Sequence, residues 1–122
     1  MKPAQQETFI NYLQQRAAAI QADTVRLMDD HRADEANFEK IRANIFQIIK
    51  TILTTAVVRR EPEKRQEELL VYRLNLFHDT WNAALEKAQA HGDQLRVRQE
   101  QVKLEALEEI RKRFEQLREV EV

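Results

Sequence analysis

The near absence of helix-breaking residues is the feature that most constrains this chain. Its 122 residues include one glycine and two prolines, so residues 4–61, 63–91 and 93–122 run without either. Glycine and proline cost about 1 and about 3 kcal/mol in a helix interior, and most tight turns use one of them. The chain also shows no strand-like alternation bounded by turn residues. We therefore predict an all-α fold.

Two helix boundaries follow from these few residues. Pro62 suits the first position of a helix, because its φ is fixed and it lacks an N–H, and it pushes Glu61 out of the helical region. Gly92 suits the left-handed position that ends a helix, and Asp93 then suits the N-cap of the next one. These signals separate the last two helices from each other and from the first half of the chain.

A third boundary is predicted in the polar segment 29–35. Aspartates favour caps and first helical turns, which places a turn at about residues 29–33. The four resulting helices cover residues of about 3–29, 33–60, 62–91 and 93–120. Helices of equal length joined by short turns run antiparallel to their neighbours. We therefore predict an antiparallel up-and-down four-helix bundle, a single domain over residues 1–122.

A long coiled-coil rod is the alternative to this bundle. The apolar spacing of the first helix, from Phe9 to Leu27, continues in step through His31 and Asp34 to Ile41. One helix over residues 4–60 would preserve that phase. Its seam would be polar for a full heptad at His31 and Asp34, which favours the turn.

Composition argues against an enzyme. The chain has no cysteine and no serine, and its one glycine cannot build a phosphate-binding loop. Dimetal sites in four-helix bundles need Glu-x-x-His pairs. The three histidines are preceded at that spacing by Met28, Asn75 and Ala88. We expect a non-enzymatic protein with no cofactor.

Charge and hydropathy suggest a cytosolic protein. The formal net charge is −1, and both signs are interspersed along the chain. Attraction to nucleic acid or to a membrane surface is therefore not expected. No uninterrupted apolar run approaches the roughly 20 residues of a membrane helix, and the N-terminus has no signal-like region.

Two polar clusters are candidate sites. Asp29, Asp30 and His31 are expected at the same pole as His91 and Asp93, where they would offer metal ligands, although helix capping explains them more simply.

The opposite pole gathers basic residues that would contact phosphate, but glutamates interrupt them, so a self-paired surface is favoured. These basic residues are Arg59, Arg60, Lys64 and Arg65.

The helix at 62–91 has more apolar surface than a bundle helix needs. Its main stripe is Leu70, Leu74, Phe77, Trp81, Leu85 and Ala88, and a second stripe is Leu69, Tyr72, Leu76 and Ala83. Exposed apolar stripes mark interfaces, so the second stripe is a candidate contact with a second copy or another protein. In the alternative arrangement this helix lies centrally and a tilted last helix covers it.

The helix at 33–60 is predicted to be a core helix. Its apolar stripe comprises Phe38, Ile41, Ile45, Ile48, Ile49, Ile52 and Ala56, broadened by Phe46 and Leu53. Such a stripe covers about half of the helix surface.

The function expected from these features is assembly. A helical interaction module would pack against itself, as a dimer, or against a helical partner. The alternative is a small-molecule or metal-binding bundle with a polar pocket between helices. The candidates for that pocket are Asn11, Arg16, Thr24 and Arg73.

Overall fold

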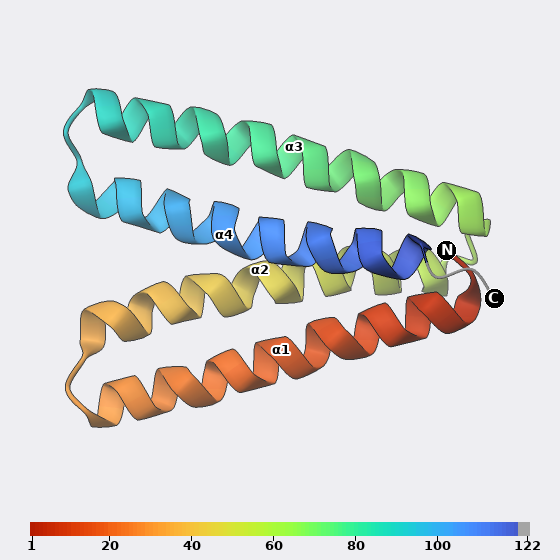
Figure 1. The fold of residues 1–122 in the computed structure, drawn as a ribbon, viewed down its shortest axis with the longest axis horizontal. Helices are drawn as coiled ribbons and strands as arrows, with labels where there is room; N and C mark the ends of the chain where they lie inside the picture. Colours follow the sequence, from red (N-terminus) through yellow and green to blue (C-terminus); the bar gives the residue numbers. More distant parts are fainter. Residues whose placement is uncertain (120–122) are drawn as a thin grey trace.

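The computed structural model describes residues 1–119, which form four antiparallel helices (Figure 1). They are α1 (Pro3–Asp29), α2 (Ala33–Val58), α3 (Glu63–Ala90) and α4 (Gln94–Glu119). The α1–α2 and α3–α4 turns lie at one end, and the α2–α3 turn, the N-terminus and the last turn of α4 lie at the other. The predicted four-helix bundle is confirmed. The rod is wrong, because the chain reverses at residues 30–32.

All three turns end the preceding helix in the same way. His31, Arg60 and Gly92 have positive φ values of 59°, 57° and 66°. The residue after each of them donates its backbone N–H five residues back, to Leu27, Ala56 and Ala88, over 2.8, 3.2 and 3.0 Å. This is the Schellman arrangement, which satisfies carbonyl groups left free at a helix end. The sequence signalled it at Gly92 alone.

The predicted helix starts are close to the observed ones. The Asp93 side chain accepts a hydrogen bond from the Arg96 backbone N–H over 3.0 Å, as an N-cap does. Pro62 precedes α3, which begins at Glu63, one residue later than predicted.

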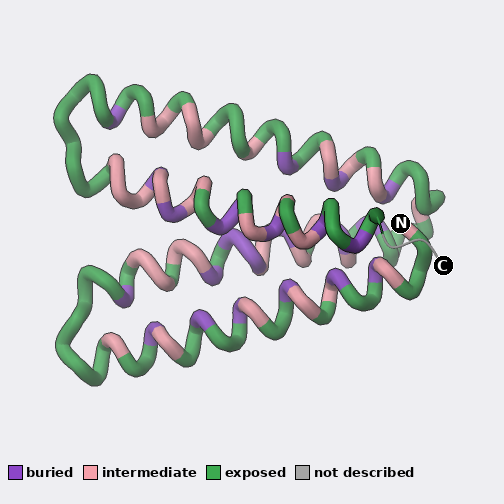
Figure 2. The backbone as a smooth tube through the Cα atoms, viewed as in Figure 1, coloured by how far each residue is buried: buried purple, intermediate pink, exposed green. Residues whose placement is uncertain are grey.

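Three of the helices provide nearly all of the core. The buried apolar cluster includes four residues of α1, five each of α2 and α4, and from α3 only Leu70 and Leu74. The Phe9 and Phe114 rings lie 5.7 Å apart and join α1 to α4. Helix α3 packs chiefly against α4, less against α2, and lies at the edge of the bundle (Figures 1 and 2).

The core face of α2 differs from the predicted stripe. Phe46 and Leu53, expected at its margin, are fully buried, whereas Ile41, Ile48 and Ile52 are only half-buried. The reason is the position of the neighbours: α1 and α4 cover one side of α2 closely, and α3 covers the other side lightly.

Helix α2 is also apolar enough, by length and composition, to cross a membrane. An 18-residue segment within it has a mean hydropathy of 1.3. The sequence prediction, based on uninterrupted apolar runs, overlooked this average. Core helices of bundles share the property, and the buried face of α2 packs against α1 and α4 here.

Truncation of a core leucine should destabilise the bundle strongly. Leu13 is fully buried between the helices, so Leu13→Ala is expected to lower the free energy of unfolding by about 2 to 5 kcal/mol. The matched control is Leu95→Ala, because Leu95 is 62% exposed and should change stability by about 0.5 kcal/mol or less. Urea unfolding followed by circular dichroism measures both. Equal losses would contradict the assigned core.

Two of the three left-handed turn residues should respond in opposite directions to substitution. Gly92→Ala introduces a side chain at a φ of 66° with nothing within 4 Å, so its cost, about 1 kcal/mol, is conformational alone. His31→Gly removes a side chain from the same conformation and should leave stability unchanged or raise it by up to about 1 kcal/mol. Thermal unfolding of both variants tests the pair, and a loss of stability in His31→Gly would argue for a specific role of the imidazole.

Candidate functional site

The second apolar stripe of α3 faces solvent. We call Leu69, Tyr72, Leu76 and Ala83 the α3 face. Tyr72 is 62% exposed and Leu76 41% exposed, Ala83 is exposed, and Leu69 is half-buried. The arrangement with a central, covered third helix is therefore wrong, because α3 lies at the edge and α4 contacts its other stripe. Figure 2 shows α3 as largely exposed along its length.

The main stripe of α3 attaches the helix to the bundle. Leu70 and Leu74 are buried in the core. The Phe77 and Trp81 rings stack with centroids 5.0 Å apart and planes 4° apart, and Lys103 Nζ of α4 lies 5.9 Å from the Trp81 ring centroid. Aromatic stacking and cation–π contact add to the area that these side chains bury. Because this stripe holds α3 to α4, the α3 face is left without a covering element among the described residues.

A shallow groove between α2 and α3 adjoins the α3 face. Its volume is about 310 Å³, and Leu69 forms part of its wall. The other lining residues come from both helices and the turn between them: Thr51, Ile52, Thr55, Ala56, Arg59, Glu61 and Arg73. The half-buried Ile52 and Leu69 give this groove an apolar floor that continues the exposed surface toward α2.

One end of α3 is fixed to α1 by buried amides. The Gln6 side chain donates a hydrogen bond to Gln66 Oε1, and Gln66 Nε2 donates to the Glu61 carbonyl over 2.7 Å. Both glutamines are buried, so their satisfied amides determine where the start of α3 lies. The position of the α3 face relative to the core is thereby fixed.

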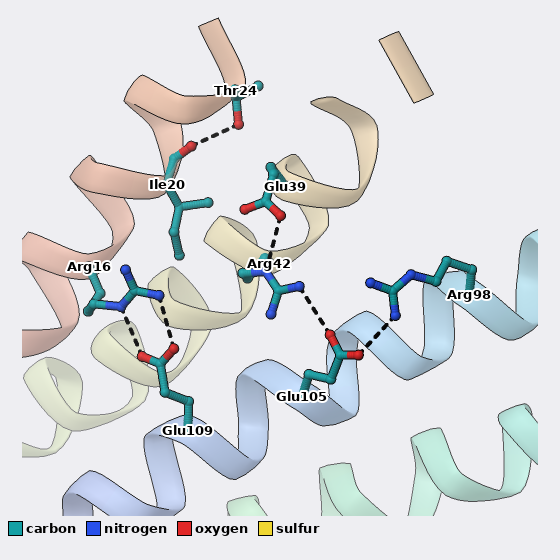
Figure 3. A network of polar contacts seen from close by, with 8 residues as sticks. All are labelled: Arg16, Ile20, Thr24, Glu39, Arg42, Arg98, Glu105 and Glu109. Atoms are coloured by element: carbon teal, nitrogen blue, oxygen red, sulfur yellow. Dashed lines mark hydrogen bonds and ion pairs between the residues drawn. The ribbon is translucent and has the colours of Figure 1, made fainter. Parts of the chain in front are cut away.

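Ion pairs link α4 to the α1–α2 hairpin (Figure 3). The Arg16 guanidinium donates from Nε and Nη2 to the two Glu109 oxygens, each over 2.9 Å, and Tyr12 donates to Glu109 over 2.5 Å. Glu105 accepts from Arg42 over 3.1 Å and from Arg98 over 2.9 Å. Each carboxylate is thus neutralised by arginine, which makes this a structural network.

Hydrogen bonds outweigh burial at Glu109. Burial would raise the pKa of this carboxyl, but the hydrogen bonds from Arg16 and Tyr12 hold it below its ordinary value. Burial and the contact with Glu109 raise the pKa of the Tyr12 phenol. A base for catalysis at neutral pH needs a pKa near 7, whereas Glu109 is shifted the other way.

The residues proposed for a polar pocket do not share one. Thr24 is buried and donates its hydroxyl to the Ile20 carbonyl over 3.0 Å, and Arg16 pairs with Glu109. Asn11 is exposed on α1, and Arg73 lines the groove beside α2. The structure therefore gives each residue a separate environment.

The two turns with candidate metal ligands do lie at one end of the bundle, as predicted. Within residues 1–119, however, no group of three or more histidine, aspartate or glutamate side chains is placed to hold a metal ion. Asp30 and His31 lie in the α1–α2 turn, His91 Nδ1 lies 2.8 Å from the Lys87 carbonyl oxygen, and Asp93 caps α4. The contacts of His91 and Asp93 support capping.

The basic residues Arg59, Arg60, Lys64 and Arg65 are all exposed around the α2–α3 turn. Glu61 shares the groove with Arg59, as the interleaved sequence suggested. At the same end, Arg118 Nε pairs with Glu67 over 2.7 Å. That this pole is a self-paired surface and does not bind nucleic acid stays a prediction.

Helix α4 contains a buried carboxylate that was not predicted from the sequence. Glu100 is fully buried; its Oε1 accepts hydrogen bonds from Arg96 and Lys103, each over 3.0 Å, and its Oε2 has no partner. The signal was its spacing, seven residues before Leu107 and fourteen before Phe114, which places it in the core stripe. The arginine and lysine partners compensate its charge.

The fold and this surface define an all-α four-helix bundle whose edge helix exposes an apolar face. Comparison of the chain with known protein families, with characterised proteins and with solved structures found no match.

The ion pairs between α4 and the α1–α2 hairpin should make the stability of the protein depend on pH. Because the folded-state pKa of Glu109 is below its unfolded value, its stabilising contribution is complete above about pH 5 and is lost as the pH falls through the folded-state pKa. Glu109→Gln should lower the free energy of unfolding at pH 7 by about 1 kcal/mol, a small value because both partners are partly exposed. The same variant should lose less stability than the wild type between pH 5 and pH 3. Urea titrations at pH 7, pH 5 and pH 3 measure the free energy of unfolding of both proteins.

The control for this titration is Glu108→Gln, the same change at an exposed neighbouring position. It should retain both the stability at pH 7 and the acid sensitivity of the wild type. Equal acid sensitivity in Glu109→Gln and the wild type would contradict a role for the pair.

Proposed function

We propose that this protein is a non-enzymatic assembly module whose α3 face packs against a helical partner. The observation that carries the proposal is the exposure of Tyr72 and Leu76 on a helix whose opposite stripe is already used to join the bundle. Aromatic side chains, tyrosine among them, are enriched at protein interfaces and among the residues that contribute most to binding energy. Apolar side chains that are exposed together along one face of a helix, as these are, mark interaction surfaces.

Three features of the surface suit helix packing. Leu69, Leu76 and Ala83 recur every seven residues, the spacing that meets another helix continuously. The small Ala83 permits close approach of a partner backbone. The groove beside Leu69 offers a hollow for a protruding side chain.

The energetics favour association of a folded partner. The main stripe and the buried Gln6–Gln66 hydrogen bond already hold α3 in place, so no ordering of the helix is needed before contact. Preorganised surfaces lose less conformational entropy on binding, which leaves more of the burial energy for affinity.

The test is the size of the protein in a gentle extract of its source cells. The wild type should elute above its own mass of 14.5 kDa, and the double variant Tyr72→Glu/Leu76→Glu should return to that mass. Two charges in a desolvated interface are expected to weaken binding by at least about tenfold. Because both residues are exposed, circular dichroism should show an unchanged fold.

Val25→Glu provides the control, since Val25 is an apolar residue of α1 with the same exposure, 62%, as Tyr72. It should leave the size unchanged. A wild type already at 14.5 kDa, or a double variant of unchanged larger size, would contradict the proposal.

A further inference from the structure

The charged residues along the α3 face have an order that matches an inverted copy of itself. Counted from Leu76, Leu69 lies seven residues before and Ala83 seven after; Tyr72 lies four before and Asp79 three after. Arg65 lies eleven before and Glu86 ten after, about 16 and 15 Å along the axis. Opposite charges and complementary groups therefore lie within one residue of equal distance on the two sides of Leu76.

The same residues share one edge of the α3 face. At 100° per residue, Arg65, Tyr72, Asp79 and Glu86 all fall on one side of Leu76, within about a quarter of the helix circumference. A two-fold axis perpendicular to two antiparallel helices places like edges of the copies next to each other. The distances from Leu76 and the shared edge of the helix therefore both fit an antiparallel pair related by a two-fold axis.

We propose that the α3 face binds a second copy of this chain, with the two α3 helices antiparallel and crossing at Leu76. This inference rests on the proposed function and names its partner. In this pairing Arg65 lies opposite Glu86 of the second copy, and the Tyr72 hydroxyl lies opposite Asp79 of the second copy. Two-fold symmetry produces each pair twice.

Charge also determines the direction of pairing. A parallel pair would set Arg65, Asp79 and Glu86 each beside its own copy, so that like charges meet at three levels. Antiparallel pairing replaces these repulsions with two Arg65–Glu86 attractions, and like charges at facing positions are what excludes wrong pairings of helices.

The charged groups involved are accessible. Arg65, Asp79 and Glu86 are all exposed. The contacts of the two acids with neighbours on α3 are long: Asp79 Oδ1 lies 3.4 Å from His78 Nδ1, and Glu86 Oε1 lies 3.5 Å from Asn82 Nδ2. Pairing with a second copy does not break a short ion pair at these acids.

Charge reversal followed by mixing tests the register. Arg65→Glu leaves glutamate at both facing positions, and Glu86→Arg leaves arginine at both, so each variant alone should dimerise about tenfold more weakly than the wild type. An equimolar mixture should form the mixed dimer with affinity near that of the wild type. Neither change should harm α3, because an acid suits its first turn and a base suits the C-terminal part of the helix, where residue 86 directly precedes the last turn.

Native mass spectrometry of purified protein over a dilution series distinguishes the two variants and their mixed dimer by mass. Lys64→Glu is the matched control: it makes the same charge change one residue away, off the α3 face, and should dimerise like the wild type. Since the chain has no cysteine, Leu76→Cys gives a second reading. It should form a disulfide with its own copy on mild oxidation, whereas Val25→Cys on α1 should not.

The outcomes separate this inference from the proposed function. A purified wild type that stays at 14.5 kDa at high micromolar concentration overturns the self-pairing, and the function stands if the assembly in extracts still depends on Tyr72 and Leu76. A dimer that is indifferent to all α3 changes overturns both. A dimer weakened by Tyr72→Glu/Leu76→Glu but unaffected by either charge reversal overturns the antiparallel register.

Discussion

The apolar stripe of α4 has to be buried on two sides at once, and the rest of the bundle depends on these two contacts. Phe114 packs against Phe9 of α1 on one side, and Lys103 lies over Trp81 of α3 on the other. Helix α4 is otherwise densely charged, and its apolar residues other than the exposed Leu95 are buried or half-buried. The hairpin of α1 and α2 and the edge helix α3 meet mainly through it.

Much of the architecture could be predicted from the sequence because breaks are rare. Pro62 and Gly92 each have one plausible use in a helical chain, and the predicted boundaries lie within two residues of the observed ones. The left-handed residues His31 and Arg60 could not be predicted in the same way. Their conformation follows from the closing hydrogen bonds of the two turns, whereas a positive φ is uncommon for residues other than glycine.

The candidate surface was only half determined by sequence. Spacing identified Leu69, Tyr72, Leu76 and Ala83 as a stripe, but periodicity does not say how many neighbours a helix has. Only the packing of α3 at the edge shows which stripe is exposed. The same limit explains the shifted core face of α2, where the half-buried isoleucines lie on the side that α3 covers lightly. Buried Glu100 escaped prediction because a glutamate in a core stripe looks like a break in the pattern.

The edge position of α3 also has a dynamic consequence. With the fewest fully buried residues, α3 is expected to have the least local stability of the four helices, and a small fraction of molecules is expected to open α3 while the other three helices retain their shared core. Its amide protons would then exchange with solvent through this partial opening, faster than those of α1. Any partner that binds only closed α3 suppresses the opening by mass action. The rate of amide exchange in α3 would then depend on the fraction of the protein to which such a partner is bound.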